Sequence, residues 1–180
     1  FSTVNPYAYM SISGTNQTVG NISTGTHPEW AVIQNTETGS NANLGTLTIY
    51  QTQDLEFKGY MRNSWANGTN AGGALKLIKY GSGKLIIEAG TIQTGGIDVM
   101  EGTLQIGNNT NSGKLFGNVD IASGSTLQYL RLNELGWSTY LQHTLSGAGT
   151  FRLKGSGILE QNSYTINRTS ANFSGNTIVE

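Results

Sequence analysis

The chain has 180 residues, of which 25 are glycine and none is cysteine, and its formal net charge is −1 at pH 7. This length suits one domain and is short for two, so we treat residues 1–180 as a single segment. The balanced charge argues against long-range electrostatic attraction to nucleic acid or to an anionic bilayer. The lack of cysteine excludes disulfides and thiolate metal sites. No apolar run is long enough to cross a bilayer, and the first residues lack a signal-peptide pattern, so we expect any export signal to have been removed.

One short signature recurs along the chain: a glycine, one or two small or polar residues, and then apolar residues that alternate with polar ones. The high glycine frequency disfavours helices. Short strands that recur at about twenty residues indicate a solenoid, because each coil must stack on its neighbours to close its core. The copies of the signature begin at Gly45, Gly73, Gly83, Gly102, Gly124, Gly149 and Gly157.

We therefore predict an all-β fold, a parallel β-helix with irregular loops that protrude from its coils. Period-two alternation turns one face of each strand inward, where aliphatic side chains would form stacked ladders. An antiparallel sandwich is the alternative, and it would show more two-residue hairpin signals between its strands. The residues predicted to point inward are Leu85, Ile87, Ile97, Val99, Leu104, Ile106, Val119, Ile121, Leu127 and Tyr129.

Three segments depart from the recurring signature: residues 26–30, 57–70 and 131–143. Together they contain all three tryptophans of the chain. Loops on a rigid scaffold often carry recognition, and exposed Trp, Tyr and Arg make strong contacts with proteins and sugars. Alternatively, these aromatic side chains fold back and cover the edge of a coil. The candidate binding residues are Trp30, Tyr60, Trp65, Arg131, Trp137 and Tyr140.

The middle of the chain resembles the passenger-associated β-strand repeat of bacterial autotransporters. The resemblance rests on LIKYGSGKL at 77–85, on QTGGIDV at 93–99 and on EGTLQIG at 101–107, so residues 77–107 form the best match. A second, partial copy covers residues 146–179, where Asn176 replaces the second glycine of the turn. Asparagine tolerates a positive φ better than most residues, so this replacement is physically acceptable.

The resemblance implies a right-handed parallel β-helix from the passenger of an autotransporter, located outside the bacterium, on its surface or secreted. Such a segment would act as an adhesin, or as a rigid stalk that presents a binding region to host cells. Its expected partners are a host-cell surface protein or glycan, the C-terminal outer-membrane barrel of the same autotransporter and, by self-association, a second rod. An alternative within the family is the β-helical scaffold of a secreted toxin or protease passenger.

No catalytic pattern accompanies these features, so we predict no enzymatic activity, no metal and no cofactor. His27 and His143 lack the spacing of a metal or catalytic motif, and no serine stands in a nucleophile elbow. Asp98 and Asp120 each lie between two aliphatic residues, so both would point outward on the same surface. A carbohydrate-active β-helix enzyme is the alternative that this acid pair suggests. Their simpler role is to keep the surface soluble and to discourage sideways strand association.

Overall fold

The computed structural model describes residues 7–39, 41–64, 72–89, 91–92, 94–110, 112–113, 115–131, 144–154 and 172–180, without the side chains of residues 91, 92 and 131. In these residues the fold is all-β apart from one short 3-10 helix, η1 (Pro28–Trp30). The strands are β1 (Ala8–Ser11), β2 (Asn16–Val19), β3 (Ala31–Gln34), β4 (Gly45–Tyr50), β5 (Leu55–Phe57), β6 (Tyr60–Arg62), β7 (Leu75–Tyr80), β8 (Lys84–Ile87), β9 (Thr91–Ile92), β10 (Ile97–Val99), β11 (Thr103–Thr110), β12 (Val119–Ile121), β13 (Thr126–Arg131), β14 (Leu145–Gly147), β15 (Thr150–Lys154) and β16 (Asn176–Val179).

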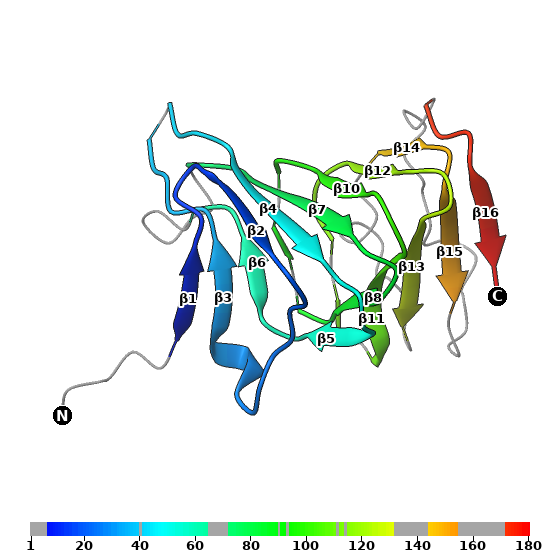
Figure 1. Cartoon of the computed structure of the whole chain (residues 1–180), viewed down its shortest axis with the longest axis horizontal. Helices are drawn as coiled ribbons and strands as arrows, with labels where there is room; N and C mark the ends of the chain where they lie inside the picture. Colours follow the sequence, from blue (N-terminus) through cyan, green and yellow to red (C-terminus); the bar gives the residue numbers. More distant parts are fainter. Residues whose placement is uncertain are drawn as a thin grey trace.

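The strands form three sheets, which we number in the order in which the chain first enters them (Figure 1). Sheet 1 has the order β1-β3-β6-β9, sheet 2 the order β14-β12-β10-β7-β4-β2, and sheet 3 the order β16-β15-β13-β11-β8-β5. From β3 to β11 the chain visits sheets 1, 2 and 3 in turn and then begins again. We call one such passage a rung.

All strand pairings in the described part of the chain are parallel, so the antiparallel sandwich considered above is wrong. The length of chain between paired residues varies from rung to rung. Leu104 pairs with Leu85, whereas Leu77 pairs with Leu47, which is considerably further away in the sequence. The additional residues of the longer rungs lie in the turns and loops, because the strands before and after them remain paired in register.

The core consists of ladders of apolar side chains that run from rung to rung. Strand β7 shows the pattern most clearly, since its residues are alternately buried and half-buried. All ten residues predicted to point inward are at most 2% exposed, so this part of the sequence analysis is confirmed. Burial of one such aliphatic side chain contributes about 1.5 to 3 kcal/mol to folding. The ladders therefore supply most of the driving force for stacking.

One inward position holds a charged residue, Lys79, whose side chain is completely buried. Its Nζ donates hydrogen bonds to the carbonyl oxygens of Gly81 at 2.5 Å, Gly83 at 2.6 Å and Glu101 at 2.8 Å. Gly81 has a φ of 84°, and a Cβ there would strike the backbone of Gln51 on the neighbouring rung. The lysine thus satisfies carbonyls at the turn from sheet 2 to sheet 3, where glycines bring the backbone too close for other side chains.

A charge introduced at an outward-facing position should cost less stability than the same charge introduced at the neighbouring inward position. Ile87→Asp places a carboxylate in the completely buried ladder, and we expect it to lower the free energy of unfolding by more than about 4 kcal/mol. Ile86→Asp, on the outer face of the same strand, should cost less than about 1.5 kcal/mol. Urea unfolding of both variants measures the difference. Equal losses would contradict the assignment of inward and outward faces.

The buried amine of Lys79 makes stability depend on pH. Burial lowers its pKa to about 8 from an ordinary value of 10.5, although the negative charges of Glu101 and Asp54 act to raise it. Between these two values the folded chain holds fewer protons than the unfolded chain, so this group makes folding more favourable as the pH rises. Relative to Lys79→Met, the wild type should gain on the order of 2 kcal/mol between pH 7.5 and pH 10 in urea unfolding. A constant difference would contradict this assignment.

Candidate functional site: the outer face of sheet 1

Two of the six candidate binding residues lie in or beside sheet 1. Trp30 ends η1 immediately before β3 and is half-buried, and Tyr60 begins β6 with 42% of its surface exposed. Arg131 ends β13 in sheet 3, far along the stack from these two, and its side chain is not described. Trp65, Trp137 and Tyr140 lie outside the described residues. The structure therefore associates Trp30 and Tyr60 with one sheet and leaves the other four predictions open.

The register of β1, β3 and β6 arranges the outward side chains of sheet 1 in two rows. Met10, Ile33 and Met61 pair with one another and contact the core, so the residues on either side of them face outward. We call these outward residues the sheet 1 face. Its first row is Tyr9, Val32 and Tyr60, and its second row is Ser11, Gln34 and Arg62.

The first row is aromatic at both ends and aliphatic in the middle. Tyr9 is 45% exposed and Tyr60 is 42% exposed, whereas Val32 between them is only 2% exposed. Val32 is therefore buried, and only the two tyrosines of this row present surface to solvent. Tyr7 is 45% exposed and continues the aromatic surface, with its ring centroid 6.0 Å from that of Tyr9. The accessible apolar surface of the row consists of tyrosine rings on either side of a buried valine.

The second row is polar. Arg62 Nε donates a hydrogen bond to Gln34 Oε1 at 3.0 Å, which ties β6 to β3 across the outer side of the sheet. Ser11, the third member, is exposed on β1. A guanidinium, an amide and a hydroxyl offer donors and acceptors with different geometries. The sheet 1 face therefore combines exposed tyrosine rings with an adjacent row of hydrogen-bonding groups.

The loop before β3 adds a second aromatic contact. The ring of His27 stacks on that of Trp30, with centroids 4.2 Å apart and an interplanar angle of 16°. His27 Nδ1 also lies 3.3 Å from Glu29 Oε1, and the histidine side chain is 59% exposed. His27 is therefore a surface loop residue, as predicted. No group of three or more metal-ligating side chains occurs among the described residues.

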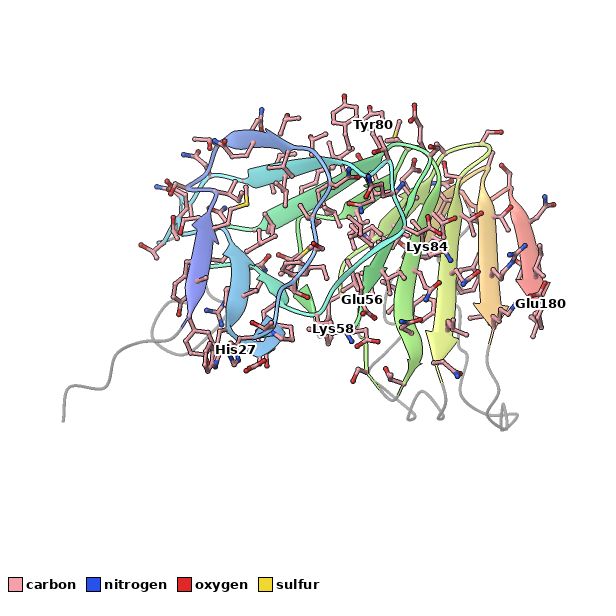
Figure 2. The ribbon with its side chains drawn as sticks, turned by 60° about the horizontal axis from the view of Figure 1, so that its bottom comes forward. His27, Glu56, Lys58, Tyr80, Lys84 and Glu180 are labelled. Carbon is pink, nitrogen blue, oxygen red and sulfur yellow. The ribbon has the colours of Figure 1, made fainter. Side chains whose placement is uncertain are left out.

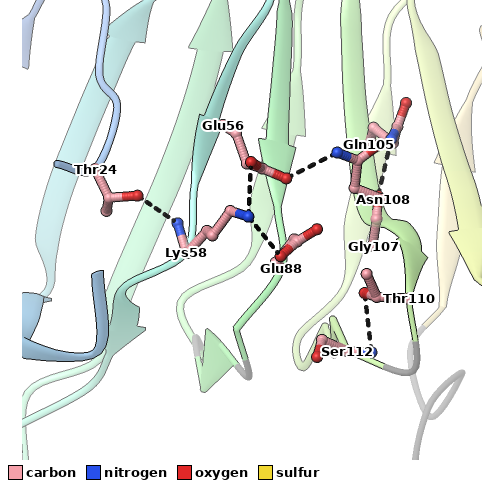
Figure 3. A network of polar contacts seen from close by, with 9 residues as sticks. All are labelled: Thr24, Glu56, Lys58, Glu88, Gln105, Gly107, Asn108, Thr110 and Ser112. Carbon is pink, nitrogen blue, oxygen red and sulfur yellow. Dashed lines mark hydrogen bonds and ion pairs between the residues drawn. The ribbon is translucent and has the colours of Figure 1, made fainter. Parts of the chain in front are cut away.

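A network of charged residues lies at the edge of sheet 3, beside the loop that leads into sheet 1 (Figures 2 and 3). Lys58 Nζ lies 3.0 Å from Glu56 Oε2 and 3.4 Å from Glu88 Oε2, so one ammonium bridges two carboxylates. Asn108 Nδ2 donates a hydrogen bond to Glu56 Oε1 at 2.9 Å. The backbone N–H of Lys58 donates to Thr24 Oγ1 at 3.2 Å. These contacts connect four successive rungs.

The two carboxyl groups of this network have pKa values displaced in opposite directions. Burial alone would raise the pKa of Glu56, but hydrogen bonds with Glu88, Lys58 and Asn108 hold it below its ordinary value. Burial raises the pKa of Glu88, helped by its hydrogen bond with Glu56 and by the charge of that group, against the attraction of Lys58. Opposite shifts are also found in catalytic acid pairs. Here both groups are engaged by one lysine, which gives the network a structural role across rungs.

Asp98 and Asp120, the acid pair considered for a carbohydrate-active enzyme, lie directly opposite each other on β10 and β12. Their predicted alignment on one outward surface is therefore confirmed. Lys76 Nζ lies 2.7 Å from Asp98 Oδ2, and Ser146 Oγ donates to Asp120 Oδ1 at 2.6 Å. Each carboxylate has its own protein partner, an arrangement that reduces repulsion between the two charges.

Sequence reasoning missed Tyr7 and Tyr9, which contribute as much exposed aromatic surface as Tyr60. The alternation in YAYM, residues 7–10, was the available signal, since it places both tyrosines on one face of a strand. It also missed the network of Glu56, Lys58 and Glu88. Glu88 is distant from Lys58 in the sequence, so only the register of β5 with β8 brings them together.

No family model, curated protein or solved structure matches this chain. In the part of the chain that the structure describes, no helix is long and apolar enough to span a membrane. Function must therefore be inferred from the chain's own residues and from the arrangement of its sheets.

Replacing each glutamate by glutamine should change the stability of the chain in opposite directions. Glu56 has a lowered pKa, so it stabilises the fold above its ordinary value of 4.5 and loses this effect as the pH falls. Glu88 has a raised pKa, so its ionisation costs stability as the pH rises through 4.5 and beyond. At pH 7, Glu56→Gln should destabilise the chain, whereas Glu88→Gln should stabilise it, each by about 1 kcal/mol or less.

Urea unfolding at pH 3, 5 and 7 checks this pair of variants. Both differences from the wild type should shrink as the pH falls toward 3, because the two carboxyl groups take up protons in both the folded and the unfolded chain. Effects of the same sign at pH 7 would contradict the network as described.

Proposed function

We propose that the three parallel sheets are the faces of a right-handed parallel β-helix. Two observations support this proposal. From β3 to β11 the chain passes through sheets 1, 2 and 3 in the same order on successive rungs, and each return to a sheet adds a parallel strand beside the previous one. Connections between parallel strands of one sheet are right-handed in nearly all proteins. A stack of this kind is rigid, because each inner strand forms hydrogen bonds with strands on both sides.

We further propose that the chain is a segment of an autotransporter passenger. The observation that carries this proposal is the position of the repeat-like residues 77–107 within the rungs. Leu77, Leu85 and Leu104 are completely buried core residues of sheets 2 and 3. Lys79 and the glycines that follow it form the hydrogen-bonded turn between these sheets. The repeat-like sequence thus has a physical purpose at each of these positions.

In this proposal the segment is extracellular and acts as an adhesin, with the sheet 1 face as its recognition surface. A rigid stack holds tyrosines in fixed positions, so little conformational entropy is lost when a host-cell surface protein or glycan binds. The six strands of sheet 3, spaced by about 4.8 Å, extend the same stack over about 24 Å. This length also suits a stalk that holds another binding region away from the cell.

Adhesion by surface-displayed protein tests the role of the face. A non-adherent bacterium displays the passenger, and its attachment to host cells is compared with that of the double variant Tyr9→Ala/Tyr60→Ala. We expect at least a fivefold loss of attachment, because two exposed aromatic contacts are removed at once. Tyr50→Ala is the matched control, since Tyr50 is 49% exposed on sheet 2 and stacks on Tyr80 at 5.1 Å.

Equal display and equal melting temperatures are required of all variants. Unchanged attachment by the double variant would contradict a recognition role for the sheet 1 face. Replacement of residues 132–142 by a short glycine-serine turn, which removes Trp137 and Tyr140, then tests the predicted binding segment 131–143. Unchanged attachment by that variant as well would leave the segment as a stalk.

A further inference from the structure

The sheet 1 face has the amphipathic pattern of a sugar-binding platform. Sugar rings have apolar C–H faces, which pack on aromatic rings, and hydroxyl groups at their edges, which need hydrogen-bonding partners. The exposed rings of Tyr9 and Tyr60 provide the apolar contact, and the row of Ser11, Gln34 and Arg62 lies beside them in register. Both rows are fixed by paired strands, so the face is formed before any ligand arrives.

The exposed aromatic area of the face argues for a small ligand rather than a protein. Tyr7, Tyr9 and Tyr60 are each a little under half exposed, so each offers on the order of 100 Å². Their sum of about 300 Å² is well below the roughly 800 Å² that each partner contributes to a stable protein interface. A few sugar rings would cover this area.

The charges around the face argue for a neutral ligand. The ammonium of Lys58 is held between Glu56 and Glu88, and Arg62 Nε is bonded to Gln34. Glu29, in the loop before β3, adds a further negative charge. Among these described groups, two cations and three carboxylates leave no excess of positive charge to attract sulfated or uronic-acid sugars.

We propose that the sheet 1 face binds a neutral, extended oligosaccharide of the β-1,4-linked hexopyranose type, laid across β1, β3 and β6. Tyr9 and Tyr60 are two strands apart, which corresponds to about 9.6 Å. In an extended β-1,4-linked chain the same ring face recurs at every second sugar, so two rings of one chain contact the two tyrosines. This inference rests on the recognition role proposed for the face and names the ligand class.

Calorimetric titration of the full chain with cellohexaose tests the inference directly. We expect saturable binding, with an affinity that falls about fivefold or more in Tyr9→Ala and in Tyr60→Ala. The matched control is again Tyr50→Ala, an equally exposed tyrosine on sheet 2, which should bind as the wild type does. Figure 2 shows its stacking partner Tyr80 on the opposite side of the view from His27 and Lys58.

Four outcomes would overturn the inference: no binding of cellohexaose, an equal loss of affinity in Tyr50→Ala, tighter binding of a heparin hexasaccharide than of cellohexaose, or equal affinity for maltohexaose. The α-linked chain of maltohexaose curves, so it should bind more weakly than the extended cellohexaose. The assay also separates this inference from the adhesin role. Cellohexaose binding with unchanged cell attachment supports the sugar site and contradicts the adhesin, whereas lost attachment without sugar binding does the reverse.

Discussion

The structure depends on one constraint: a strand can satisfy its backbone only by pairing in register with the strands of the rungs before and after it. Leu77, for example, pairs with Leu47 on one side and with Ile97 on the other. This pairing stacks like positions on like positions, so a buried side chain in one rung has buried neighbours in the next. No single rung has a core of its own, and stability is shared between neighbours.

The same register that builds the core also builds the outer faces. Because side chains alternate along a strand, ladders of inward residues are accompanied by ladders of outward ones. The outward ladders differ from sheet to sheet: Asp98 and Asp120 line up on sheet 2, whereas Tyr9 and Tyr60 flank Val32 on sheet 1. A fold of this kind can therefore vary its surface chemistry without changing its core.

The inward positions were predictable because strand periodicity alone assigns them, and Ile106 and Val119 are buried as that periodicity requires. The sheet 1 face was only partly predictable. Tyr60 stood out as an exposed type of residue in an irregular segment. Its alignment with Tyr9 depends on two strand pairings, Tyr9 with Val32 and Val32 with Tyr60, which are separated by different lengths of chain. No sequence motif in this region indicates either pairing. The bridge from Lys58 to Glu88 depends on side-chain reach between rungs as well as on register, and a sequence pattern records neither.

The parallel register itself is the claim to test most directly, and the absence of cysteine makes a cross-linking measurement clean. Thr48 and Ile78 are paired and face outward on β4 and β7, so Thr48→Cys/Ile78→Cys should form a disulfide on mild oxidation. Thr48→Cys/Lys76→Cys, displaced by two residues along β7, should form little, because the diagonal distance is too long. We expect cross-linking in the first variant alone; equal cross-linking in both, or more in the second, would contradict the parallel register.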